Sequence, residues 1–160
     1  MASRFRFLFL NGAKPTIMNK HFILSGLAAT VANLIVNAGA YFLFLKSVFE
    51  KYPAISTEFQ KQLARPADQL VGWAMAATSL TMGFFISTVI QWSGARTFVS
   101  GLKKGFIVAF LFWSSVNFGL YASSYHFSQT GLFVDLACSI TAMTLSAAIA
   151  AWILGKEKTN

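Results

Sequence analysis

The 160-residue chain has little of what supports a soluble enzyme or a disulfide-stabilised secreted domain. It contains one cysteine, Cys138, three prolines and five acidic residues, and charged residues make up 11% of it. A single cysteine excludes an internal disulfide and a thiol-oxidoreductase that works through a cysteine pair. The charged share is about half that of a typical soluble domain. The composition therefore argues against a protein that is solvated on all sides.

What the chain has in abundance is long apolar segments that are nearly free of charge. Residues 22–45, 70–92, 105–125 and 132–154 each exceed the roughly 20 residues that a helix needs to cross a bilayer core of about 30 Å. Asp135 is the one carboxylate within these segments. Little length remains for a separate soluble domain. We therefore predict an all-α, four-helix transmembrane bundle in contact with the lipid bilayer.

The distribution of lysine and arginine predicts the orientation of the bundle. Nine of these residues lie beside the termini and in the second loop: Arg4, Arg6, Lys14, Lys20, Arg96, Lys103, Lys104, Lys156 and Lys158. Four lie in the first loop: Lys46, Lys51, Lys61 and Arg65. Basic residues are retained on the cytoplasmic side. Both termini are therefore expected there, with residues 1–20 as a cytoplasmic arm. This orientation accounts for the net charge of +8 without a nucleic-acid partner.

The first loop, residues 46–69, is the only sizeable connection. Pro53 ends an extension of the first helix, and Thr57 and Gln60 have the spacing of a capping box at a helix N-terminus. Pro66 disfavours helical geometry at the residue before it. We predict a short amphipathic helix that lies on the outer membrane surface, with docking of a partner as the alternative.

No motif indicates catalysis, a cofactor or a metal. His21 and His126 are expected at opposite membrane faces, about 30 Å apart, so they cannot ligate one metal ion. No Ser-His-Asp set can be assembled on one side, and no glycine-rich phosphate loop follows a strand. We therefore expect no catalytic residues, no cofactor and no metal.

Small residues recur at helical spacing in two spans. Because lipid supplies no hydrophobic drive for helix association, helices in membranes pack through small residues that allow close approach. In the second span these are Gly72, Ala76, Ser79, Gly83 and Ser87, and in the fourth they are Cys138, Ala142, Ser146 and Ala150. We predict that both sets are packing seams.

Polar residues within three spans form a candidate cluster. Asn33 and Asn37 fall near mid-membrane in the first span and are expected to face the bundle interior, because an unpaired buried amide costs a few kcal/mol. They form either bonds between helices or a polar lining for a solute or a proton. The bonding interpretation is favoured.

The third and fourth spans are expected to form an antiparallel hairpin joined by residues 126–130. In that register Tyr121 lies level with Asp135, and Asn117 lies level with Ser139. An acid inside a membrane is a candidate functional residue by default. Asp135 either couples protons to a solute or bonds the two helices of the hairpin, and the second role is favoured.

A resemblance rests on two short stretches of these spans. The third span contains Asn-Phe-Gly-Leu-Tyr at residues 117–121, and the fourth opens with Leu-Phe-Val-Asp-Leu at residues 132–136. They resemble small bacterial four-helix integral membrane proteins classed as a domain of unknown function. Many of those proteins follow the Asp closely with a Trp, whereas Ala137 and Cys138 follow it here. The resemblance implies the four-span topology and a bacterial inner (plasma) membrane, and it implies no activity.

Two functions are compatible with these patterns, and an enzyme is the least supported. The favoured one is a non-enzymatic protein that acts by helix packing, as a homo-oligomer or as an accessory subunit of a larger membrane complex. The alternative is a small proton-coupled carrier or channel with a polar path through Asn33, Asn37, Asn117 and Asp135. A carrier needs a water-accessible cavity that reaches the midplane. A packing subunit needs a dry core and a small-residue seam that faces outward.

Overall fold

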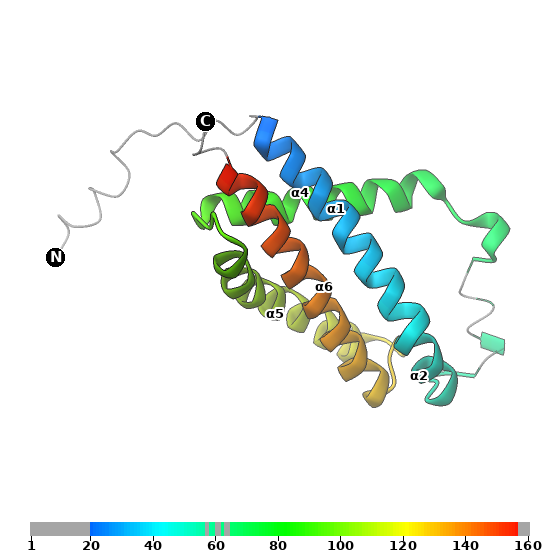
Figure 1. Cartoon of the computed structure of the whole chain (residues 1–160). Coiled ribbons are helices and arrows are strands. Elements are labelled where there is room, and N and C mark those ends of the chain that lie inside the picture. Colours follow the sequence, from blue (N-terminus) through cyan, green and yellow to red (C-terminus); the bar gives the residue numbers. More distant parts are fainter. Residues whose placement is uncertain (1–19, 57, 60–61, 63–64, 157–160) are drawn as a thin grey trace, which may run out of the picture.

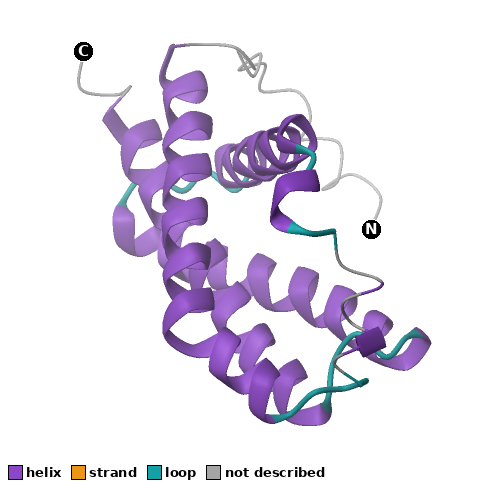
Figure 2. Cartoon of the chain, turned by 90° about the vertical axis from the view of Figure 1, so that its right-hand side faces the viewer, coloured by secondary structure: helices purple, strands orange, loops and turns teal. Residues whose placement is uncertain are grey.

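In a computed structural model, residues 20–56, 58–59, 62 and 65–156 are described, and all regular structure in these ranges is helical (Figures 1 and 2). Four helices in this part are long and apolar enough to cross a membrane. They are the segment beginning with α1 (Lys20–Ala40), then α4 (Gly72–Trp92), α5 (Phe98–Ser123) and α6 (Gln129–Gly155). The predicted all-α class with four apolar spans is confirmed.

The first span is longer than the sequence predicts. α1 continues without a break into a π-helical turn, η2 (Tyr41–Leu45), and then into α2 (Lys46–Lys51). The last helical bond runs from the Tyr52 N–H to the Val48 oxygen at 2.8 Å, directly before Pro53. The helix therefore extends through Lys51 because nothing before the proline interrupts its backbone hydrogen bonds.

Side-chain caps set the starts of the last two helices. The Ser100 N–H donates to Thr97 Oγ1 at 3.2 Å, and the Thr97 N–H donates to Ser100 Oγ at 3.0 Å. This capping box begins α5 at Phe98, well before the predicted residue 105. Ser128 accepts a bond from the Gly131 N–H at 3.2 Å and begins α6 at Gln129, before the predicted residue 132. Both helices therefore begin before the apolar runs that predicted them.

Two predicted features fall mainly on residues outside the described ranges. The cytoplasmic arm lies there apart from Lys20, and so do Thr57 and Gln60, the predicted caps of the short outer helix. In the described part of this connection, Glu58, Phe59 and Gln62 are helical, and the Phe59 N–H donates to Ser56 Oγ at 3.4 Å. A 3₁₀ turn, η3 (Ala67–Gln69), follows Pro66. The arm and the amphipathic helix remain predictions.

α6 is the central helix of the bundle. It packs against α5, α1 and α4, and α1 packs against α4. Gly101 and Gly105 let α5 approach α6 closely, because a Cβ at Gly101 would lie 2.6 Å from the Ala151 Cβ and one at Gly105 would meet the Ala147 Cβ. The start of α1 and the end of α6 lie at the same end of the bundle (Figure 1).

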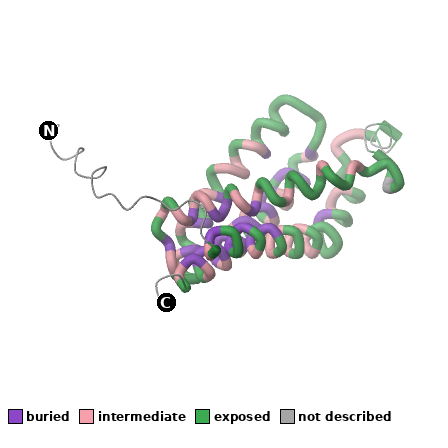
Figure 3. Tube along the Cα trace, turned by 90° about the horizontal axis from the view of Figure 1, so that it is seen from above, coloured by how far each residue is buried: buried purple, intermediate pink, exposed green. Residues whose placement is uncertain are grey.

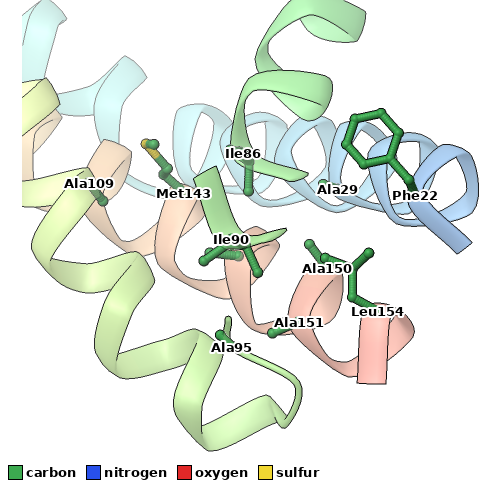
Figure 4. Close-up of a cluster of buried hydrophobic side chains, with 11 residues drawn as sticks. Phe22, Ala29, Ile86, Ile90, Ala95, Ala109, Met143, Ala150, Ala151 and Leu154 are labelled. Carbon is green, nitrogen blue, oxygen red and sulfur yellow. The ribbon is translucent and has the colours of Figure 1, made fainter. Parts of the chain in front are cut away.

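The hydrophobic core lies near that same end (Figures 3 and 4). Alanines of α6 dominate it, and bulky side chains of α1 and α4 fill the space around them. The buried cluster consists of Phe22, Ala29, Ile86, Ile90, Ala95, Ala109, Met143, Ala147, Ala150, Ala151 and Leu154. The opposite end of the bundle is much more exposed (Figure 3).

α4 leaves the bundle over its N-terminal half. It crosses α1, and the half that begins at Gly72 projects beyond the other helices (Figure 1). Its buried residues are Gly83, Ile86, Ser87 and Ile90, all in the C-terminal half. One half of this span is therefore part of the core, and the other half has no neighbour within the described chain that buries it.

Candidate functional site

The hydrogen-bonded polar cluster between α5 and α6 consists of Asn117, Asp135 and Ser139. Asn117 is 1% exposed, and its Nδ2 donates to Asp135 Oδ2 at 2.8 Å. Ser139 Oγ donates to the same oxygen at 3.5 Å from one turn further along α6. Asp135 is half-buried. The arrangement satisfies a buried amide with a carboxylate and so joins the two helices of the hairpin.

The predicted pairing within this cluster is shifted by one helical turn. Tyr121 is 44% exposed and forms no hydrogen bond with Asp135, and Asn117 bonds to Asp135 instead. The reason is that α5 ends and α6 begins earlier than predicted. With α5 ending at Ser123 and α6 beginning at Gln129, the hairpin is centred on His126, and Asn117 and Asp135 lie at equal distances along the chain from it. The prediction had centred the turn two residues later.

Asn33 and Asn37 do not join this cluster. Asn37 Nδ2 donates to the Asn33 backbone oxygen at 2.8 Å, within its own helix, and both residues are half-buried. No hydrogen bond links either of them to Asn117 or Asp135. The four residues of the predicted polar path are therefore separated into two local groups.

The α4 seam is divided between two environments. Ser87 Oγ is hydrogen-bonded to Ser25 Oγ of α1, and Gly83 lies against Thr30. By contrast, Ser79 is half-buried and both Gly72 and Ala76 are exposed. The seam packs inside the bundle at one end of α4 and faces outward at the other.

The α6 seam lies almost entirely inside the bundle. Ala142, Ser146 and Ala150 are buried, and Cys138 is half-buried. The Ser146 hydroxyl donates to the Ala142 oxygen at 2.7 Å, so its polar atom is satisfied within the helix. This small-residue face lets α6 approach its neighbours closely at the centre of the bundle.

Several polar side chains that the sequence analysis did not single out are buried. Ser25 and Thr30 of α1 are buried against α4. Trp113 Nε1, Ser114 Oγ and Thr144 Oγ1 are buried with no hydrogen-bond partner among the described residues. Trp113 precedes Asn117 by one turn of α5, and this spacing was the available signal that it belongs on the same face.

The core encloses a cavity that is too small for a solute. The cavity has a volume of about 10 Å³, which is roughly the space that one water needs, and its lining is apolar. Ile86, Ile90, Val108 and Met143 are among the residues around it. The interior of the packed half is therefore dry.

A much larger cleft lies at the opposite end of the bundle. Its volume is about 930 Å³. One wall comes from Tyr41, α2 and the residues that follow α2, and the other wall comes from residues 124–128 in the turn between α5 and α6. The cleft does not include the Asn117–Asp135 pair.

Neither the geometry of the described residues nor similarity assigns a chemical activity. Within the described ranges no three His, Cys, Asp or Glu side chains come together to hold a metal ion. No family model matches this chain, and no curated protein or solved structure matches it. A function must therefore be argued from the packing of the helices.

Proposed function

We propose that this chain is a non-enzymatic multipass protein of the bacterial inner membrane that self-associates through α4. The proposal rests on the exposed small-residue face of α4, which we define as the exposed Gly72 and Ala76 together with the half-buried Ser79. It also takes both termini to be cytoplasmic, as the excess of lysine and arginine beside the termini and in the second loop of the sequence indicates.

The main support is the absence of burial along half of a membrane-length helix. Between Gly72 and Met82 no residue is buried, whereas four are buried in the remaining half of α4. The Thr78 and Ser79 hydroxyls donate to the Ala74 and Met75 oxygens at 2.9 Å each. Their polar atoms are therefore satisfied without a partner, and this face can contact another helix in an apolar environment.

The spacing on this face favours a second copy of the chain as the partner. Gly72 and Ala76 form a small-xxx-small pair, which lets two helix backbones approach closely. A two-fold interface places the same patch of each subunit against the other. If the chain is instead an accessory subunit of a larger complex, the same face of α4 binds a different protein. The mass of the bound partner then distinguishes the two cases.

The carrier alternative has less support from the structure. A carrier needs a polar cavity at the midplane, whereas the core cavity is apolar and holds about 10 Å³. The side-chain amide of Asn37 also donates a hydrogen bond to the backbone of its own helix. The resemblance to the four-helix bacterial proteins adds a topology to this proposal and no substrate.

Replacing Ala76 with leucine tests the proposed interface. The larger side chain separates the two α4 helices, so we expect the yield of a differently tagged second copy in co-purification from mixed membranes to fall about tenfold, equivalent to about 1.4 kcal/mol. Ala137→Leu is the matched control, because Ala137 is also an exposed alanine but lies on α6. Equal yields for wild type and Ala76→Leu, or no co-purification of wild type, would contradict self-association through α4.

Cysteine labelling tests the orientation. In a Cys138→Ala background, a membrane-impermeant thiol reagent added outside intact cells should label Tyr125→Cys and leave Lys103→Cys unlabelled until the membrane is permeabilised. Tyr125 is 79% exposed beside the α5–α6 turn, and Lys103 is exposed near the start of α5. The opposite pattern would place both termini outside.

A further inference from the structure

The large cleft has the dimensions and lining of a ligand site. Its volume of about 930 Å³ lies within the range of about 300–1,000 Å³ typical of small-molecule sites. Phe49 and Phe127 lie in its wall with ring centroids 6.3 Å apart, and Phe127 is 8% exposed. The absence of a side chain at Gly131 leaves room for the Phe49 ring, since a Cβ at Gly131 would lie 3.1 Å from that ring. The aromatic base of the cleft is therefore built by packing of α2 against α6.

The cleft also carries one charge of each sign on the same helix face. Lys46 and Glu50 are one turn apart on α2, both line the cleft, and both are exposed. Neither forms an ion pair with the other or with another described residue. Side chains four apart on a helix lie about 5–6 Å apart at Cβ. The cleft thus presents an ammonium and a carboxylate, both unpaired, on side chains one helical turn apart.

The cleft lies at the depth where lipid headgroups meet the hydrocarbon. It opens beside the ends of the first, third and fourth spans, and Tyr41, Tyr52 and Tyr125 line it. Tyrosine is enriched at this level of a bilayer because its ring is apolar and its hydroxyl is polar. The ligand most available at this position is a phospholipid.

We propose that this cleft binds the headgroup of a zwitterionic phospholipid with a primary ammonium, phosphatidylethanolamine. The phosphate lies at Lys46 and the ammonium at Glu50, and the start of the acyl chains lies against Phe49 and Ile55. Two carbons separate phosphate and ammonium in this headgroup, which suits two groups one helical turn apart. An anionic lipid such as phosphatidylglycerol leaves Glu50 without a cation and close to a phosphate, so it binds more weakly.

Lipid binding by delipidated protein tests this site. In native mass spectrometry with phosphatidylethanolamine and phosphatidylglycerol of identical acyl chains, we expect wild type to bind the former about fivefold more tightly, as two charge-assisted contacts replace one. Lys46→Gln should weaken both lipids. Glu50→Gln should remove the preference, because phosphatidylethanolamine loses its ammonium contact and phosphatidylglycerol no longer meets a carboxylate.

Matched controls are Lys103→Gln and Asp68→Asn, which remove one charge of each sign from exposed residues outside the cleft. Both should keep the fivefold preference. Because Lys46 and Glu50 are exposed, their variants should also keep the melting temperature of wild type. Equal binding of the two lipids by wild type, or an unchanged preference in Glu50→Gln, would overturn the proposal.

Discussion

Replacing Gly83 with alanine is expected to destabilise the bundle by about 1–3 kcal/mol, the usual cost of overpacking a core. A Cβ at this position would collide with Thr30 Oγ1 and lie 2.7 Å from both the Thr30 nitrogen and the Gly26 oxygen. Two of these three atoms belong to the backbone of α1, so a change of rotamer cannot make room. The helices must separate, and this also stretches the bond between Ser25 and Ser87. Thermal unfolding in a mild detergent measures the loss.

Gly119→Ala is the matched control for this prediction. Gly119 lies on α5 with no heavy atom within 4 Å of a Cβ at that position. Because alanine is favoured over glycine inside a helix by roughly 0.5–1 kcal/mol, this variant should be as stable as wild type or slightly more so. Equal losses at Gly83 and Gly119 would show that α1 and α4 do not pack as closely as described.

Replacing Asp135 with leucine is expected to cost about 1–3 kcal/mol, because the buried Asn117 amide loses its acceptor. The double variant Asn117→Leu/Asp135→Leu removes both polar groups and should recover much of that loss. Asp135→Asn should be close to wild type, since its amide oxygen can still accept the bond from Asn117. Tyr121→Phe should also be close to wild type, as the Tyr121 hydroxyl does not bond Asp135.

A double-mutant cycle of unfolding free energies separates this account from simple loss of packing. Additive losses at Asn117 and Asp135 would show that the two side chains are not coupled. A large loss of unfolding free energy in Tyr121→Phe would instead support the register in which Tyr121 pairs with Asp135.

The sequence was sufficient to predict the helical class and the number of spans, because long uncharged apolar runs are hard to accommodate in any other way. It was less informative at helix ends. α6 begins at Gln129, three residues before the apolar run that starts at Leu132, and α5 ends at Ser123 instead of residue 125. These two shifts move the centre of the hairpin to His126. A one-turn error in the partner of Asp135 followed directly from that shift.

The environment of α4 could not be predicted from residue spacing. Gly72, Ala76, Gly83 and Ser87 all fall on one face of a helix, and spacing does not indicate which of them meet a neighbour in the same chain. The crossing of α4 with α1 decides this, since Gly83 and Ser87 lie at the crossing and Gly72 and Ala76 lie beyond it. Likewise, the sequence does not indicate whether the amide of Asn37 bonds to its own helix or to a neighbouring helix. In the structure it donates to the backbone of its own helix.

Photo-crosslinking in native membranes tests the central claim most directly. A photoreactive amino acid at position 76, within the exposed small-residue face of α4, should give a product with the mass of two copies of this chain. The same amino acid at position 111, where Leu111 is exposed on α5, should give no such product. Products of equal yield at both positions, or a product at position 76 with any other mass, would contradict self-association through α4.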